Sequence, residues 1–293
     1  MAFPATPKSA SGNPGEAAAP AYLLRIAHLW HLTSLDAPTV AVVWLLAFAW
    51  AANILLPLWL PCTLALATWA VYIGDRLLDA RPAHSAASPL ACNLRPRHYF
   101  HWRFRRFFIP AAAISGITAI LLARHFMLPD ARTRNTLLAC AALAYFTSVH
   151  HPSRLISRFT IPKELLVAVL FTLTCIAPTW FRMASGQLWL LAPALAFIAL
   201  AWLNCHAIEV WESPTSGSSS EIRRLALTGA ALGLLAAAAS FNQPRSALLL
   251  VSATASSLLL ALLQACRTRL EATTLRAAAD LVLLTPLLLL VMR

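Results

Sequence analysis

The sequence predicts an all-α fold, a polytopic membrane protein with about nine transmembrane helices. Of its 293 residues, 59% are hydrophobic and 12% are charged, against a charged share of about 25% in a typical soluble domain. The apolar residues form long runs, which are typical of helices that cross a bilayer. These observations exclude an ordinary water-soluble domain and a disordered chain.

The distribution of positive charge along the chain also indicates a membrane protein. The net charge is +12, from 23 Lys and Arg against 11 Asp and Glu. No separate basic domain carries this charge, because the basic residues lie in short loops between the apolar runs. Membrane proteins distribute Lys and Arg in this way. We therefore expect membrane lipids as partners and no nucleic acid.

The N-terminal segment, residues 1–33, is expected to lie outside the bilayer core. Residues 1–20 are rich in Pro, Ala, Ser and Gly, which favours disorder, and they lack the apolar stretch of a signal peptide. Residues 22–32 mix apolar side chains with Arg25, His28 and His31, which favours an interfacial helix. Residues 34–293 are interpreted as one transmembrane domain, since no soluble stretch is long enough for another.

Nine apolar runs follow. A helix needs about 20 residues to cross a bilayer core, and the fourth run is the shortest, so that its ends must include Thr136 and His150. The nine runs are residues 38–59, 61–78, 107–122, 137–149, 165–180, 188–208, 225–241, 247–266 and 275–292.

The orientation of the chain in the membrane is predicted from the number of Lys and Arg residues in the loops on each side. With nine spans, the side that holds the N-terminus carries 17 of the 23 Lys and Arg residues, and the other side carries six. Because cytoplasmic loops are enriched in Lys and Arg, we expect a cytoplasmic N-terminus. The expected location is the inner membrane of a bacterium.

Two acidic residues close the second run. Asp75 and Asp79 are four residues apart and therefore share a helix face. One interpretation is a helix end whose carboxylates pair with loop arginines. The other is a hard-cation site, since Mg²⁺ is bound by one or two carboxylates together with substrate phosphates. The spacing alone leaves both interpretations open.

A second polar cluster closes the sixth run on the same side, and it comprises Asn204, Glu209 and Glu212. One interpretation of this cluster is that it contributes ligands to the same metal site. The other is that Glu209 and Glu212 are interfacial anchors beside Trp211. A shared metal site requires these carboxyl groups to meet those of the second run over one cavity. A basic stretch, residues 95–106, lies in a loop on this side and favours either binding of anionic lipid or a lid whose arginines hold a diphosphate.

The chain resembles the UbiA superfamily of intramembrane prenyltransferases from about Ser34 onward. Residues 35–38 (LDAP) are similar to the family's R-L-D-x-P start, with Ser34 in place of the arginine, and residues 75–79 (DRLLD) to part of its first aspartate motif. Residues 151–162 (HPSRLISRFTIP) are similar, with altered spacing, to its Y-P-x-x-K-R-x-T-x-x-P stretch, and the sixth-run cluster lies where the second motif is expected. Val71 and Tyr72 replace the initial Asn-Asp, and the second motif has fewer carboxylates, which implies weaker metal binding.

The resemblance implies a UbiA-like bundle and Mg²⁺-dependent transfer of a prenyl group from an allylic diphosphate to a lipophilic or aromatic acceptor. It implies catalytic roles for Asp75 and Asp79. The implied metal ligands are Asp75, Asp79, Asn204, Glu209 and Glu212. The implied diphosphate ligands are Arg154, Arg158, Lys163, Arg95 and Arg97. The implied prenyl pocket includes Asn53, Trp69, Tyr72 and Tyr145.

Two other functions compete with the enzyme. The first is a non-catalytic UbiA-like membrane protein that binds a lipid or a partner protein. The second is a cation-coupled transporter, in which the intramembrane carboxylates would bind the ion. Transporters often contain inverted repeats and Gly-interrupted helices, whereas this chain has eight glycines and no strong repeat, which disfavours the transporter.

Overall fold

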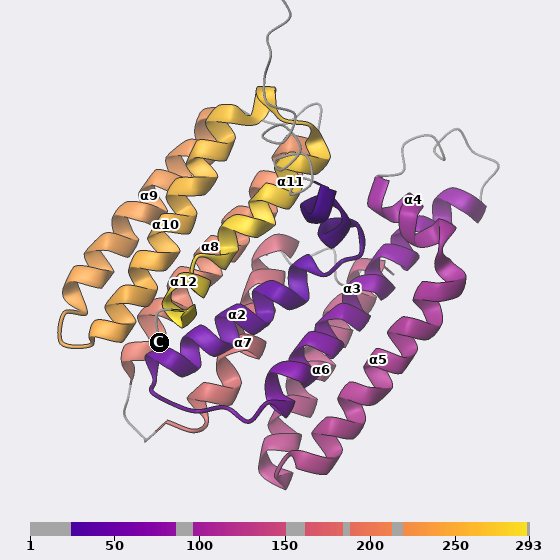
Figure 1. The fold of residues 1–293 in the computed structure, drawn as a ribbon, viewed down its shortest axis with the longest axis horizontal. Helices are drawn as coiled ribbons and strands as arrows, with labels where there is room; N and C mark the ends of the chain where they lie inside the picture. Colours follow the sequence, from indigo (N-terminus) through magenta and orange to yellow (C-terminus); the bar gives the residue numbers. More distant parts are fainter. Residues whose placement is uncertain (1–24, 86–95, 151–161, 184–187, 213–218, 292–293) are drawn as a thin grey trace, which may run out of the picture.

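A computed structural model describes residues 25–85, 96–150, 162–183, 188–212 and 219–291 (Figure 1). Over these ranges the chain is helical and contains no strand, which confirms the predicted all-α class. The N-terminal 24 residues, and with them the predicted disordered tail, lie outside the described residues. The helix Arg25–Leu32 matches the helix predicted before the first run.

Eleven α-helices that the structure describes over most of their length follow one another along the chain after Arg25–Leu32. Their bounds are α2 (Asp36–Ala51), α3 (Trp59–Ser85), α4 (Pro96–Arg103), α5 (Arg105–Phe126), α6 (Pro129–His150), α7 (Lys163–Trp180), α8 (Leu191–Glu212), α9 (Ser219–Ala239), α10 (Pro244–Cys266), α11 (Ala272–Leu281) and α12 (Leu287–Val291). Three short 3₁₀ helices span Leu188–Leu190, Arg267–Arg269 and Val282–Leu284.

Several helices are long and apolar enough to cross a membrane, so the chain is an integral membrane protein. Within the described residues five helices meet this requirement, and they contain α5, α7, α8, α9 and α10. A sixth span results if Arg25–Leu32 and α2, which meet at 92°, are one broken span. The expected count of about nine is therefore met only in part. The α2 helix has 16 residues, and the ninth run is divided between α11 and α12.

Both ends of α2 are set by residues in the left-handed backbone region. Ser34 has a φ of 56° and precedes the helix, whereas Asn53 has a φ of 55° and follows it. This region is costly for residues other than glycine, and Asn adopts it more readily than most. The turn at Ser34 separates Arg25–Leu32 from α2 and places the first turn of α2 inside the bundle.

The α2 helix lies at the centre of the bundle, between α3 on one side and α8 and α10 on the other (Figure 1). Trp44 is fully buried, and its ring stacks on Phe197 of α8 with a centroid distance of 3.8 Å. The Trp44 indole N–H donates a hydrogen bond of 2.9 Å to the carbonyl oxygen of Leu283. One side chain thus joins α2, α8 and the segment between α11 and α12.

The α9 and α10 helices form an antiparallel pair with close backbone approach at Gly233. A Cβ atom at Gly233 would overlap Oγ1 of Thr254 on α10, whereas a Cβ atom at Gly229 would lie 3.7 Å from Oγ of Ser257. Small residues at such contacts let helices in membranes pack closely.

We expect Gly233→Ala to destabilise the protein relative to Gly229→Ala by about 1–3 kcal/mol, the range for overpacking. Both substitutions gain the same helix propensity, so their difference reports the clash with Thr254. Unfolding of the purified variants in mixed micelles measures it. Equal stability of the two variants would contradict the close approach of α9 and α10.

Candidate functional site

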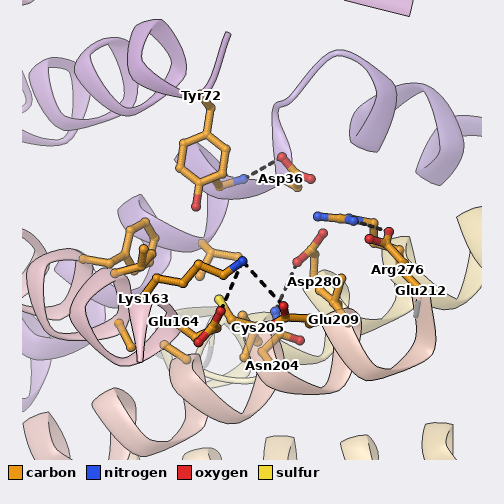
Figure 2. A pocket seen from close by; sticks show the side chains of 18 of the residues that line it. Asp36, Tyr72, Lys163, Glu164, Asn204, Cys205, Glu209, Glu212, Arg276 and Asp280 are labelled. Carbon is orange, nitrogen blue, oxygen red and sulfur yellow. Dashed lines mark hydrogen bonds and ion pairs between the residues drawn. The ribbon is translucent and has the colours of Figure 1, made fainter. Parts of the chain in front are cut away.

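A cavity of about 240 Å³ lies among α2, α3, α7, α8 and α11 (Figure 2). Its wall combines carboxylates and cationic groups with apolar side chains. The polar and thiol-bearing lining residues are Asp36, Tyr72, Arg76, Lys163, Glu164, Asn204, Cys205, Glu209, Glu212, Arg276 and Asp280. The apolar lining residues are Ala37, Val40, Val167, Ala168, Phe171, Ala201, Ile208 and Leu283.

Helix ends bring these polar groups to one level of the bundle. Asp36 lies in the first turn of α2, and Glu164 lies in the first turn of α7. Carboxylates in these positions are stabilised by the positive end of the helix dipole. Glu209 and Glu212 lie in the last turn of α8, where the dipole offers no such stabilisation, so they depend on cationic neighbours.

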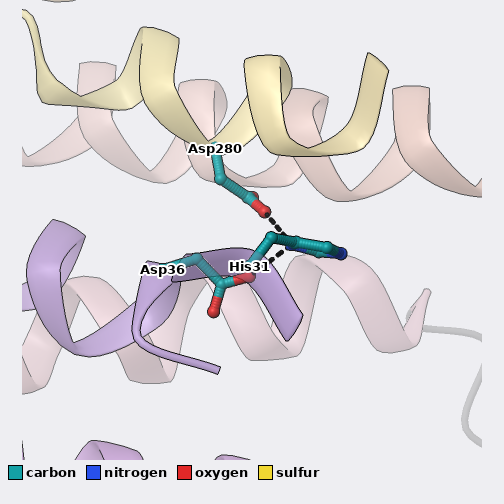
Figure 3. Close-up of side chains that lie close together, drawn as sticks. All are labelled: His31, Asp36 and Asp280. Atoms are coloured by element: carbon teal, nitrogen blue, oxygen red, sulfur yellow. Dashed lines mark hydrogen bonds and ion pairs between the residues drawn. The ribbon is translucent and has the colours of Figure 1, made fainter. Parts of the chain in front are cut away.

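Beside this cavity, Asp36 and Asp280 form a compact cluster with His31 (Figure 3). His31 Nδ1 lies 2.8 Å from Oδ2 of Asp36 and 3.4 Å from Oδ2 of Asp280. The second oxygen of each carboxylate also accepts a hydrogen bond. Oδ1 of Asp36 accepts one of 2.9 Å from the backbone N–H of Ala37, and Oδ1 of Asp280 accepts one of 3.2 Å from the side-chain amide of Asn204. His31 and Asp36 are only 2% and 3% exposed.

This cluster has two chemical capabilities. An imidazole between two carboxylates can hold or transfer a proton. The cluster also offers one ligand atom from each residue, all within 4.8 Å of one another, and imidazole with carboxylate is a common ligand set for divalent metals.

Ion pairs surround the wider part of the cavity. Lys163 Nζ lies 3.6 Å from Oε1 of Glu164 and 3.5 Å from Oε1 of Glu209 (Figure 2). Arg276 donates a hydrogen bond through Nη1 to Oε1 of Glu212. Acidic groups from α7 and α8 are thus each paired with a cationic side chain that also lines the cavity.

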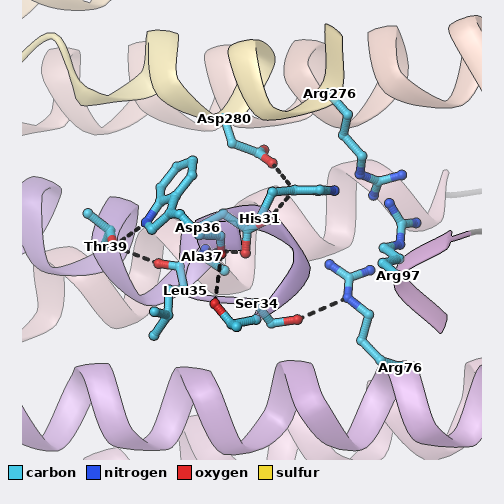
Figure 4. A network of polar contacts seen from close by, with 12 residues as sticks. His31, Ser34, Leu35, Asp36, Ala37, Thr39, Arg76, Arg97, Arg276 and Asp280 are labelled. Atoms are coloured by element: carbon cyan, nitrogen blue, oxygen red, sulfur yellow. Dashed lines mark hydrogen bonds and ion pairs between the residues drawn. The ribbon is translucent and has the colours of Figure 1, made fainter. Parts of the chain in front are cut away.

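A polar network links the start of α2 to α3 and α4 (Figure 4). Arg76 donates a hydrogen bond of 3.2 Å through Nε to Oγ of Ser34, and Nε2 of His101 lies 3.3 Å from the same oxygen. Arg97 is buried, and its Nη1 lies 3.6 Å from Oε1 of Glu212. The network holds the strained Ser34 turn, and with it the Asp36 carboxylate, in place.

His101 of α4 gives this network a pH dependence. Burial, together with the positive charge of Arg76, lowers the pKa of His101 to about 4, and the carboxylate of Asp36 offsets this only in part. The unfolded chain binds a proton at this imidazole near pH 6.5. Between these two values the unfolded state holds more protons, so the free energy of unfolding falls as the pH falls from about 6.5 to 4.

We expect His101→Gln to remove part of this loss of stability at low pH. Unfolding midpoints of the purified protein between pH 7 and pH 4 provide the measurement, and His125→Gln, at an exposed position of α5, is the matched control. Equal slopes of stability against pH in wild type and His101→Gln would contradict the assignment.

The structure brings together some of the residues that the sequence predicted. Lys163, Asn204, Glu209, Glu212 and Tyr72 all line the cavity. The polar cluster at the end of α8 thus faces this cavity, but without the two aspartates of the second run that a shared metal site required. Arg97, predicted as a diphosphate ligand, reaches this region through its ion pair with Glu212.

Asp75 and Asp79 are not among the lining residues. Tyr72 and Arg76 line the cavity from α3, whereas the two aspartates, each three residues further along, are rotated by about 60° around the helix axis. The Asp79 carboxylate is exposed and lies 3.7 Å from Nε2 of His98. The five predicted metal ligands therefore do not share this cavity.

Two residues of the predicted prenyl pocket also lie elsewhere. The Asn53 side chain accepts a hydrogen bond of 2.6 Å from Nη1 of Arg245, beyond the opposite end of α2. Trp69 donates a hydrogen bond of 3.0 Å to the carbonyl oxygen of Thr33. Tyr145 is part of α6, but its side chain is outside the described part of the structure. Arg95, Arg154 and Arg158 also lie outside the described residues.

The cavity and its cluster contain further polar and thiol-bearing residues that the sequence did not predict as site residues, namely His31, Asp36, Arg76, Glu164, Cys205, Arg276 and Asp280. One signal for them was available, because acidic residues within apolar runs mark functional sites by default. Asp280 interrupts the ninth apolar run. Arg276 lies four residues before it and thus on the same helix face.

Comparison with protein-family models, with curated proteins and with solved structures finds no significant match for this chain.

Proposed function

We propose that the chain is an intramembrane prenyltransferase of the UbiA kind. In this proposal a nine-helix bundle, with its N-terminus in the cytoplasm of a bacterium, transfers a prenyl group from an allylic diphosphate to a lipophilic or aromatic acceptor. The observation that carries the proposal is the cavity itself. Carboxylates and three cationic side chains surround the same space as a set of apolar side chains, which matches a ligand with a charged head and an apolar tail.

The donor set of the cavity fits Mg²⁺, which prefers oxygen ligands. Asn204 is 4% exposed, and its Oδ1 atom has no hydrogen-bond partner among the described residues. Buried polar atoms without a partner are rare. Asn204, together with the carboxylates of Asp280 and Glu209 in the same wall, would hold the ion. Bound Mg²⁺ would neutralise charge on a diphosphate leaving group.

The diphosphate would be held by Lys163, Arg76 and Arg276, which line the cavity from three different helices. Guanidinium and ammonium groups form charge-assisted hydrogen bonds with phosphate oxygens. Because Lys163 and Arg276 are now paired with Glu209 and Glu212, a diphosphate would compete with these carboxylates for the cationic groups.

The transfer itself requires little covalent chemistry from the chain. The allylic C–O bond breaks, its electron pair leaves with the diphosphate, and the acceptor attacks the allylic carbon and then loses a proton. Val40, Phe171 and Leu283 offer an apolar wall for the prenyl chain. The Tyr72 ring, which also lines the cavity, can stabilise a developing allylic cation. The His31–Asp36 pair lies close enough to the cavity to take up the released proton.

A second function, non-catalytic binding of a lipid diphosphate, is favoured by a specific observation. The carboxylates of Glu164, Glu209 and Glu212 each have a cationic partner within the protein. Such pairing reduces the negative charge that is available to a metal ion, while the apolar wall of the cavity is unaffected.

Release of diphosphate separates the two functions. The purified protein is incubated with allylic diphosphates of several chain lengths and a panel of aromatic acceptors, with and without Mg²⁺. The enzyme is expected to release diphosphate only with Mg²⁺. Thermal stabilisation by the same donors without release would support the binding protein and contradict the enzyme.

A further inference from the structure

A second cavity, of about 590 Å³ and open to the surface, lies between the start of α9 and the end of α10, and most of its lining side chains are exposed. It shares no lining residue with the first cavity. Its wall combines three arginines with hydroxyl and amide groups and two apolar side chains. These residues are Ser220, Arg223, Arg224, Leu227, Gln264, Ala265, Arg267 and Thr268.

Within the described part of the structure, the three arginines of this cavity form no ion pair. No ion pair or hydrogen bond joins the side chains of Arg223, Arg224 or Arg267 to any described residue. The segment before α9, residues 213–218 (SPTSGS), contains no acidic residue. The first turn of α9 adds the positive end of its helix dipole. Glu221, in the first turn of α9, is three residues before Arg224, so three arginines against one nearby acid leave an excess of positive charge that a mobile anion would neutralise.

The position of the cavity matches the headgroup region of a membrane. It lies where two candidate membrane spans, Ser220–Ala239 and Pro244–Arg269, begin and end side by side. Basic pockets between transmembrane helices on the cytoplasmic side bind the headgroups of anionic lipids. The distribution of Lys and Arg between the loops predicts that these two loops lie on the cytoplasmic side.

Apolar surface continues from the cavity along both helices. Leu227 and Leu234 are seven residues apart on α9, and Leu258 and Ala265 are seven residues apart on α10, so each pair lies on one helix face. All four of these side chains are exposed. A ligand whose phosphate sits among the arginines would thus find apolar contacts for its acyl chains, which a free phosphate ion would leave unused.

We propose that this cavity binds the phosphate group of an anionic phospholipid, with the acyl chains lying along the α9 and α10 faces. Arg223, Arg224 and Arg267 form charge-assisted hydrogen bonds to the phosphate oxygens. Ser220 and Thr268 contribute hydroxyl groups. The assignment is independent of the proposed prenyl transfer.

Lipid binding to the delipidated, full-length protein tests the assignment, measured by native mass spectrometry with phosphatidylglycerol and phosphatidylcholine as probes. We expect one phosphatidylglycerol to bind at least about tenfold more tightly than phosphatidylcholine. The triple variant Arg223→Gln, Arg224→Gln, Arg267→Gln should lose this preference. The single variant Arg224→Glu, at an exposed position, should weaken phosphatidylglycerol binding about tenfold and disturb the fold least.

The matched control is the triple variant Arg105→Gln, Arg106→Gln, Arg269→Gln, which removes equal charge from exposed positions outside the cavity. The preference should survive in this control. If both triple variants lost the preference for phosphatidylglycerol equally, the proposed site would be wrong, and general attraction of the anionic lipid to a basic surface would explain the binding. Displacement of the lipid by excess inorganic phosphate would overturn the lipid assignment and identify a site for free phosphate.

Discussion

Replacing Asp280 with Asn is expected to lower Mg²⁺-dependent diphosphate release at least about 100-fold, within the range for loss of a group that stabilises or positions a reacting centre. The Asp280 carboxylate contacts both His31 and Asn204, so it joins the buried cluster to the amide that faces the cavity. Asn preserves the shape and removes the negative charge. Rates of diphosphate release from the purified variants provide the measurement.

Glu271→Gln is the matched control, because Glu271 directly precedes α11, is exposed and does not line the cavity. Mg²⁺-dependent protection of the fold against heat gives a second readout, which should be lost in Asp280→Asn and kept in the control. If Asp280→Asn retains most of the activity while Asp75→Asn or Asp79→Asn abolishes it, the catalytic site is the one that the motif in the second run predicted.

Replacing Trp44 with Ala is expected to destabilise the protein by about 3–5 kcal/mol, the usual cost of removing a large aromatic side chain from a core. Trp44 is fully buried, stacks on Phe197 and donates a hydrogen bond to the carbonyl of Leu283. The substitution would leave a void between α2 and α8 and one backbone acceptor without its donor. Unfolding of the purified variant in mixed micelles measures the change.

Two further variants separate the contributions of Trp44. Trp44→Phe keeps an aromatic ring for stacking and loses the hydrogen bond, so it should cost roughly 1–3 kcal/mol. Phe107→Ala removes a similar ring from an exposed position of α5 and should cost little. If Trp44→Ala is no more destabilising than Phe107→Ala, this would contradict the burial of Trp44 and the placement of α2 at the centre of the bundle.

The start of α2 illustrates how far sequence reasoning reached. The LDAP segment, which contains Asp36, resembles a family motif, and Asp280 interrupts the ninth apolar run, but neither residue was predicted to belong to a site. Their meeting with His31 was not predictable from spacing, because the two aspartates are far apart in the chain and His31 reaches them only through the 92° turn at Ser34. A single left-handed residue is invisible to hydropathy patterns.

The second run illustrates the opposite case, in which a strong local pattern did not specify a position in space. Asp75 and Asp79 share a helix face, as their spacing predicts. Which face of α3 lines the cavity depends on how α3 packs against α2 and α7. That packing selected the neighbouring face, which carries Tyr72 and Arg76.

The sequence by itself determined the class of the protein, because runs of apolar residues long enough for a bilayer permit only helices or closed barrels there, and this chain carries helical runs. It also determined that the few acidic residues would matter, since carboxylates in such runs are costly. Only the tertiary structure decided which of them meet. Five carboxylates and three cationic groups reach one cavity because helix ends from separate parts of the chain converge, and convergence depends on packing between helices rather than on any pattern within one of them.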